Sequence, residues 1–210
     1  MKVIVLSESS ADEAAIRILV DGLLGIGTQG IPSLPLRSRG WPSVIKVLPS
    51  VLMRLHYQTD ADALVIVADS DDSPTHQNTH DVPGGENDRC RLCQLRRVVS
   101  AVKGRLRPVS GRSSIKTAIG LAVPAVEAWY LCGLNPQINE ATWTRKLQSE
   151  RITYTRRTLK EDVYGTDRPT LDIETQHAVA AATRLANDIS ILEQLFPNGF
   201  GSFAQEVRSW

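Results

Sequence analysis

Acidic residues follow two apolar runs at positions where they could bind a divalent cation. Glu8 comes directly after the run at 2–7, and Asp69 and Asp71 come directly after the run at 63–68. Because alternate residues of an extended segment point the same way, Asp69 and Asp71 are expected to share one cation. Mg²⁺ or Mn²⁺ bound by carboxylates keeps several water molecules and leaves room for phosphate oxygens. The spacing therefore predicts a cation site that could accommodate a phosphate.

An alternative role for acids at these positions is to cap helices. That role suits Asp12, Glu13 and Asp72, and it suits the three acids of the expected cation site less well. Crowded carboxylates without a partner repel one another, which is a physical reason to expect a cation among them.

Two histidines and two cysteines follow the second acidic segment with a spacing that could bind zinc. His76 and His80 form a His-x-x-x-His pair, and Cys90 and Cys93 form a Cys-x-x-Cys motif followed by an expected helix. Together they are a Cys₂His₂ ligand set, and the Pro83-Gly84-Gly85 segment allows the loop to fold back. The alternative is a pair of buried cysteines on the helix and two solvated loop histidines. A redox role is less favoured, because nothing thioredoxin-like surrounds the cysteines.

The formal net charge of +1 conceals an uneven distribution of charge along the chain. Residues 1–88 carry a net charge of −6, residues 89–126 of +9 and residues 127–210 of −2. A basic block directly after the acids suits a polyanion held beside bound cations. The residues expected to contact nucleic-acid phosphates are Arg89, Arg96, Arg97, Lys103, Lys116 and Lys160. The alternative is a basic helix face that is solvated or that pairs with the acidic N-terminal region.

Apolar periodicity and turn residues divide the chain into alternating strands and helices. Strands are expected over residues 2–7, 31–37, 63–68 and 115–123. Helices are expected from a Ser10–Glu13 capping box to about residue 25, and over 41–56, 90–106, 125–132, 140–149 and 174–196, with a short helix at the end. Residues 72–88 are rich in Asp, Pro, Gly and Asn, which is typical of a loop.

This alternation predicts an α/β fold, in which a mostly parallel sheet is flanked by helices and followed by a helical C-terminal extension. We expect a single domain over residues 1–210, with a zinc-binding insertion at 72–95 and a mostly helical part at 135–210. In such a sheet, ligands bind at the carboxyl ends of the strands, where the acids lie.

Composition limits the expected location and class of the protein. No apolar run is long enough to span a bilayer, and the first residues read as a strand rather than a signal peptide, so we expect a cytoplasmic protein. Three cysteines argue against a secreted disulfide framework. Aromatic residues make up 5% of the chain, so a stacking platform for single strands is not expected, and Trp129 and Trp143 are expected in the core.

The order of these motifs resembles the TOPRIM-like family of small bacterial proteins related to the OLD and RloB nucleases. Ser7–Glu13 resembles the family's opening strand-Glu-Gly segment, and Ala68–Asp72 resembles its Asp-x-Asp segment. Glu127-Ala128-Trp129 matches its Glu-Ala-Trp motif, and Phe196–Phe203 is similar to its Pro-x-x-Phe-x-x-Phe-like tail. Ser9 departs from the pattern, because it stands where Gly is usual and restricts the backbone near Glu8.

The resemblance implies a TOPRIM-type fold, a divalent metal and phosphodiester cleavage. By position, Glu8 matches the family glutamate that binds metal or acts as general acid or base. Asp69 and Asp71 match the metal-binding pair, and Glu127 matches a later acid that completes a second metal site. The implied function is a Mg²⁺- or Mn²⁺-dependent nuclease of DNA, with RNA less favoured, in phage defence beside an ATPase partner.

Three other functions fit the same sequence. The chain could be a non-catalytic nucleic-acid-binding or regulatory subunit of a defence complex, in which cutting requires, or is replaced by, a partner. A primase-like or nucleotide-modifying enzyme is a second alternative, but no separate nucleotide-binding motif supports it. A zinc-stapled interaction domain is a third, non-enzymatic alternative.

Overall fold

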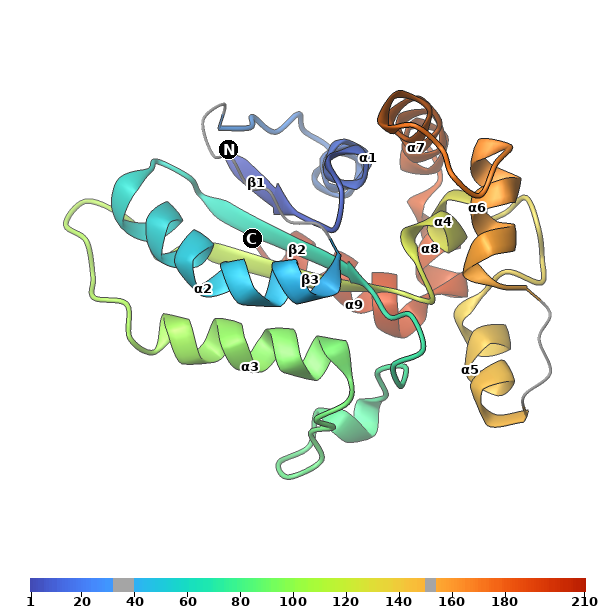
Figure 1. Cartoon of the computed structure of the whole chain (residues 1–210). Helices are drawn as coiled ribbons and strands as arrows, with labels where there is room; N and C mark the ends of the chain where they lie inside the picture. The colour runs from blue at the N-terminus through green and yellow to red at the C-terminus, as the bar shows by residue number, and fades with distance from the viewer. Residues whose placement is uncertain (32–39, 150–153) are drawn as a thin grey trace.

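A three-stranded parallel sheet forms the centre of the computed structural model, which describes residues 1–31, 40–149 and 154–210 (Figure 1). The strands β1 (Val3–Leu6), β2 (Ala63–Asp69) and β3 (Lys116–Ala122) lie side by side in that order. Every residue of β1 and β2 is buried, as expected for parallel strands that are covered on both faces. The α/β class and the parallel sheet predicted from the sequence are therefore confirmed.

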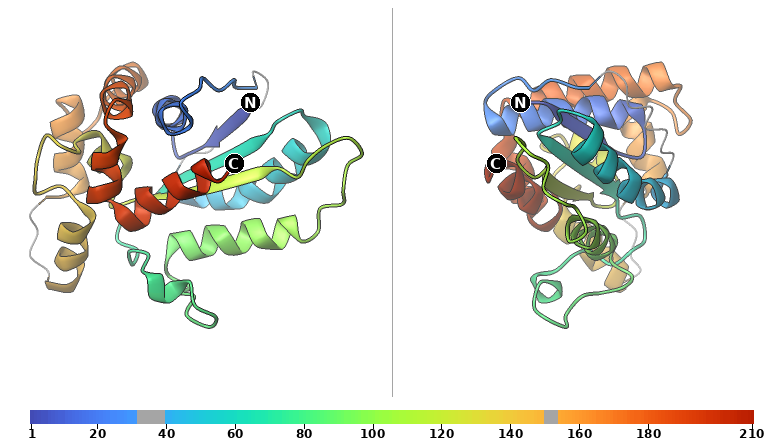
Figure 2. Two further views of the ribbon diagram at one scale, coloured as in Figure 1. Left: turned by 180° about the vertical axis from the view of Figure 1, so that it is seen from behind. Right: turned by 90° about the vertical axis from the view of Figure 1, so that its left-hand side faces the viewer.

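Helices cover both faces of this sheet. On one face, α2 (Trp41–Gln58) packs against β2 and α3 (Arg91–Lys103) against β3. On the other face lie α1 (Ser10–Leu24), which packs against β1, and α9 (Ser202–Arg208), which packs against β3 (Figure 2). The apolar stripe of each helix faces the sheet, so the layers share one hydrophobic core.

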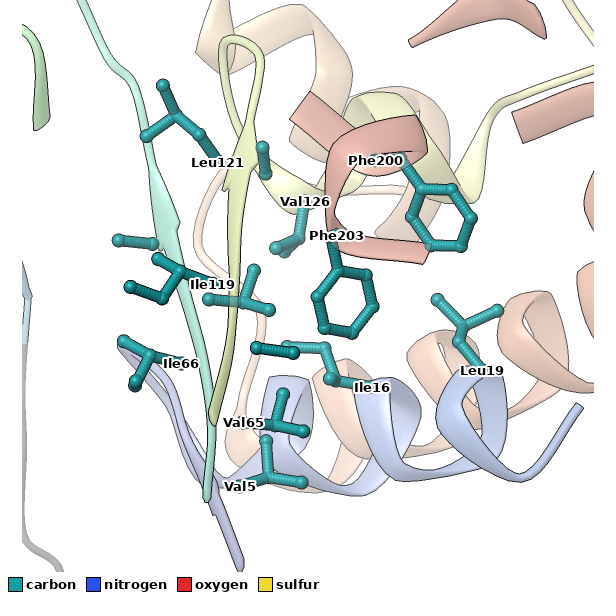
Figure 3. Close-up of a cluster of buried hydrophobic side chains, with 14 of the residues drawn as sticks. Val5, Ile16, Leu19, Val65, Ile66, Ile119, Leu121, Val126, Phe200 and Phe203 are labelled. Atoms are coloured by element: carbon teal, nitrogen blue, oxygen red, sulfur yellow. The ribbon is translucent and has the colours of Figure 1, made fainter. Parts of the chain in front are cut away.

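The core between the sheet, α1 and α9 is densely apolar (Figure 3). Val5 and Val65 project from neighbouring strands toward Ile16 of α1 and Phe203 of α9. All four side chains are almost completely buried, and burial of this kind contributes roughly 1.5–3 kcal/mol per large side chain. This layer fixes the position of α1 and therefore of the segment that joins it to β1.

The elements between β3 and α9 lie mostly beyond the carboxyl ends of the strands (Figure 1). They are α4 (Val126–Tyr130), α5 (Glu140–Ser149), α6 (Arg156–Tyr164), α7 (Leu171–Ala186), α8 (Ile189–Leu195) and the single wide turn η2 (Pro197–Gly201). The longest of them, α7, packs along α1. Within the described ranges, no helix has the length and apolar character required to cross a membrane.

The C-terminal tail, which consists of η2 and α9, covers the outer edge of β3. The backbone N–H of Ile119 donates to the carboxylate of Glu206 on α9 at 2.8 Å. Gly199 of η2 lies against the carbonyl of Leu121, so closely that a Cβ at this position would be 2.2 Å from that oxygen. The tail therefore satisfies one polar group of the edge and sits directly on another.

Most of the predicted elements are confirmed, within a few residues at their ends. The predicted loop over 72–88 contains only the short 3₁₀ turn η1 (Asn78–His80). The predicted strand over 31–37 falls on residues 32–39, which lie outside the described residues. Trp129 and Trp143 are buried in the core as predicted.

Two local predictions are wrong, and one helix was missed. The helix predicted over 174–196 is two helices, α7 and α8, because the chain leaves the helical conformation at Asp188. The helix α6 was not predicted, because its sequence is polar and buries only Leu159 and Tyr164. Ser9 rather than Ser10 caps α1, since Ser9 is extended and its side chain accepts the backbone N–H of Asp12.

Substituting Gly199 by alanine should destabilise the protein, because the new methyl group would collide with the Leu121 carbonyl. We expect the free energy of unfolding to fall by about 3 kcal/mol, measured by urea denaturation. Gly27→Ala is the control, because a Cβ there meets no atom within 4 Å, and its effect should stay within about 0.5 kcal/mol. Equal stability of the two variants would contradict the placement of η2 on β3.

Candidate active site and metal-ligand cluster

Glu8 ties the end of β1 to the end of β2. It lies two residues beyond β1, and one of its carboxylate oxygens accepts the backbone N–H of Asp69 at 3.0 Å. Burial raises the pKa of Glu8, and the nearby charge of Asp71 raises it further, against the opposing effects of the Asp69 N–H and two arginines. The predicted site residue therefore stands at the carboxyl edge of the sheet.

Asp69, the last residue of β2, is deeply buried, with 6% of its surface exposed. One carboxylate oxygen accepts the backbone N–H of Val126 at 3.0 Å, and this bond joins β2 to the start of α4. Burial raises the pKa of Asp69 well above its ordinary value, and the charges of Glu127 and Glu8 act in the same direction. Asp69 thus carries its charge at a large electrostatic cost.

Asp71 reaches the same place through a turn, not through strand alternation. Its φ of 49° is in the left-handed region, so the extended segment assumed for Asp69 and Asp71 ends before Asp71. The backbone N–H of Asp71 donates to the carbonyl of Pro124 at 2.9 Å, which holds the turn against the segment after β3. The prediction that the two carboxylates approach one point holds, but its stated reason is wrong.

Glu127 completes the group of acids. It lies on α4 with 5% of its surface exposed, and Lys160 of α6 has its Nζ atom 3.8 Å from the carboxylate. Burial raises the pKa of Glu127, while Lys160 and Arg156 lower it. We call Glu8, Asp69, Asp71 and Glu127 the carboxylate centre.

Two arginines pair with the carboxylate centre. Arg91, at the start of α3, donates to the Asp69 carbonyl at 2.7 Å and to the Asp71 carboxylate at 2.6 Å, and its guanidinium lies 4.9 Å from the centre of the Trp41 ring. Arg156, at the start of α6, bridges Asp69, at 2.8 Å, and Asp71. Arg156 and its ion pairs were missed from the sequence. Arg91 follows the alternative expected for the basic segment, because it pairs with an acid of the N-terminal region.

A cavity of about 180 Å³ opens beside the carboxylate centre. Its lining includes five carboxylic acids and two basic residues, namely Glu8, Asp12, Asp69, Glu127 and Glu174 with Arg156 and Lys160. The lining therefore carries more negative than positive groups. Such an excess in a largely buried place favours either proton uptake or a bound cation.

The side chain of Asp12 lines this cavity. Its carboxylate accepts the hydroxyl groups of Tyr130, at 3.1 Å, and of Ser9, at 2.8 Å. Burial raises the pKa of Asp12 to about 7, and the charge of Glu127 contributes. The capping role expected for Asp12 is therefore wrong for its side chain, because the cap is supplied by Ser9.

The residues predicted to contact nucleic acid are scattered over the molecule. Lys160 lines the cavity, whereas Lys103 and Lys116 lie at the opposite edge, where Lys103 donates to Thr117 at 2.9 Å. Arg96 pairs with Asp81 and Glu206, and Arg97 pairs with Asp88. The backbone of Arg89 is held by Asn87. Contact of any of these residues with nucleic acid stays a prediction.

The two histidines and two cysteines of the loop come together as the spacing suggested. One ligand atom from each of His76, His80, Cys90 and Cys93 lies within 4.8 Å of every other. All except His80 are buried. This cluster could bind a metal ion.

Comparison of the chain with protein-family models, curated proteins and solved structures finds no match. The interpretation of the carboxylate centre and of the His/Cys cluster therefore depends on their own geometry.

The metal-free protein should lose stability as the pH rises from about 4 to about 7, because Asp12 binds its proton more tightly in the folded than in the unfolded chain. A shift of the Asp12 pKa to about 7 corresponds to a loss of up to about 4 kcal/mol across this window. Urea denaturation in EDTA at several pH values measures this fall, and Asp12→Asn should reduce it.

The matched control is Asp162→Asn, which changes an exposed carboxyl of α6. Its stability should follow the wild-type pH dependence. A wild-type profile that Asp12→Asn leaves unchanged would contradict a protonated, buried Asp12.

Proposed function

We propose that the chain is a TOPRIM-like, divalent-metal-dependent phosphodiesterase that cleaves DNA at the carboxylate centre. The observation that carries the proposal is the convergence of four carboxylates at the carboxyl edge of a parallel sheet, beside a cavity lined by more acids than bases. Ligands of open parallel sheets bind at this edge. A cation would relieve the repulsion among these acids.

Mg²⁺ or Mn²⁺ fits the available donors, which are hard carboxylate oxygens. Glu8, Asp69 and Asp71 would hold one ion, and Glu127 would contribute to a second. When bound, such ions withdraw charge from a phosphate and lower the pKa of a water molecule. The excess of acids in the cavity lining supports this assignment.

Arg91 and Arg156 are placed to bind the phosphate. Their guanidinium groups now donate to carboxylates, and the same planar set of N–H groups matches phosphate oxygens. Nε of Arg156 is buried and has no hydrogen-bond partner among the described residues, so a donor is left for a ligand. When a phosphate accepts these N–H groups, oxygens of Asp69 and Asp71 become available to a cation.

Glu8 is placed to take the proton of an attacking water. The Asp69 N–H fixes the orientation of its carboxylate at 3.0 Å. Burial raises the pKa of Glu8, a direction that suits a general base working near neutral pH. Because the charge must be present for this role, activity should increase with pH over the range in which Glu8 loses its proton.

The TOPRIM-like assignment rests on the order of the motifs together with their place in the sheet. Glu8 follows β1 and Asp69 ends the adjacent parallel strand β2, so the two motifs meet at one edge. Glu127, of the Glu-Ala-Trp motif, lies on the helix whose first N–H, that of Val126, donates to the Asp69 carboxylate. Phage defence and an ATPase partner are proposed from the motif order alone.

The second candidate is a non-catalytic, nucleic-acid-binding or regulatory subunit of a defence complex. The observation that favours it is the pairing of Arg156 with both Asp69 and Asp71, since an arginine can replace a cation permanently. In that case the fold would bind DNA phosphates without cleaving them.

Cleavage of supercoiled plasmid in Mn²⁺ tests the nuclease. Glu8→Gln and Asp69→Asn should each reduce the rate at least about 100-fold, because each removes a charge on which cation binding and proton transfer depend. Asp162→Asn, the exposed carboxyl of α6, should retain the wild-type rate.

Gel shift of the same DNA separates the two candidates. Binding without cleavage, with a wild-type rate no greater than that of Asp69→Asn, would reject the nuclease and support the regulatory subunit. Cleavage that survives in both variants would place the chemistry elsewhere.

A further inference from the structure

The His/Cys cluster has the dimensions of a tetrahedral zinc site. Sγ of Cys90 lies 3.6 Å from Nδ1 of His76, and Sγ of Cys93 lies 3.7 Å from Nδ1 of both His76 and His80. With zinc–sulfur bonds of about 2.3 Å and zinc–nitrogen bonds of about 2.0–2.1 Å, tetrahedral geometry places sulfur and nitrogen about 3.5 Å apart. These three sulfur–nitrogen separations thus match a tetrahedral site, and all four ligand atoms lie within 4.8 Å of one another.

The carboxylate of Asp81 lies beside His76, the more buried of the two histidines. Nε2 of His76 lies 3.1 Å from the carboxylate of Asp81, and Arg96 holds that carboxylate at 2.7 Å. Arg96 also lies 3.3 Å from Nε2, but a guanidinium cannot accept a proton, so Asp81 is the acceptor beside Nε2. With a proton on Nε2, the lone pair of Nδ1 is directed at the cysteines. Metal-binding histidines usually donate their second N–H to a carboxylate in this way.

The ligand types select the ion and its role. Two thiolates and two imidazoles favour Zn²⁺ over Mg²⁺, which prefers oxygen. Four protein ligands leave no open position for water or substrate, as in structural sites. The exposed fractions of 3% for His76, 0% for Cys90 and 6% for Cys93 agree with a closed site.

We propose that His76, His80, Cys90 and Cys93 bind one structural Zn²⁺, which fixes the loop after β2 to the start of α3. Arg91 lies between the two cysteines in the sequence, and its side chain reaches Asp69 and Asp71. The zinc thereby positions Arg91 in the carboxylate centre. This last step rests on the proposed function, whereas zinc binding itself does not.

Metal analysis of the purified full chain tests the site. We expect about one zinc per chain after dialysis, and replacement by Co²⁺ should give the near-ultraviolet absorption of cobalt thiolates and the visible bands of a tetrahedral ion. Cys93→Ser should lose both signals. Cys132→Ser is the control, because Cys132 is also buried and lies outside the cluster, and it should keep them.

Asp81→Asn keeps all four ligands and tests whether the Asp81 carboxylate strengthens metal binding by His76. We expect its zinc affinity to fall about 10- to 100-fold, measured by competition with a chromophoric chelator. Much less than one zinc per wild-type chain, a Cys90–Cys93 disulfide in protein purified without air, or equal zinc loss in Cys93→Ser and Cys132→Ser would overturn the proposal.

Two further readouts separate this site from the proposed function. Glu8→Gln should keep its zinc while it loses cleavage. A wild-type chain that carries its full zinc content but cleaves no DNA would reject only the nuclease. Chelation of zinc should make the loop over 72–90 sensitive to limited proteolysis, whether or not DNA is cleaved. Resistance of this loop after complete zinc removal would contradict the structural role.

Discussion

Repulsion among carboxylates that meet where parallel strands end is the constraint on which the rest of this structure depends. Glu8 and Asp69 are brought together by the register of β1 and β2, and both lose most of their hydration there. Their charge is opposed by Arg91 from α3 and by Arg156 from α6, while Lys160 of α6 pairs with the neighbouring Glu127. The positions of the two helices α3 and α6 are therefore tied to the charge of a few acids.

The part of this arrangement that depends on neighbouring residues could be predicted from the sequence. An apolar run followed by an acid predicts both a parallel strand and an acid at its carboxyl end, so the positions of Glu8 and Asp69 in the sheet were predicted correctly. The cluster of histidines and cysteines could likewise be predicted from local spacing, because a Cys-x-x-Cys motif at the start of a helix brings both sulfur atoms close together.

The part that depends on packing between distant segments could not be predicted. Arg156 lies on a polar helix without an apolar repeat, and nothing near it in the sequence indicates that it reaches Asp69. Nucleic-acid contact was predicted for the basic residues from their density in the sequence, without knowledge of the direction in which α3 runs. This helix runs from the carboxylate centre to the other end of the sheet, so Arg91 is at the centre and Lys103 is remote.

The tail over β3 decides how this small sheet can meet other molecules. A three-stranded sheet has two edge strands, and an unpaired edge invites a strand from another chain. On β3, Glu206 occupies the N–H of Ile119 and Gly199 lies on the carbonyl of Leu121. A strand that approached this edge would have to displace α9 and η2 together with their buried phenylalanines. Association through β3 by strand addition is thus closed to the folded protein, and a partner on this side must dock on helices.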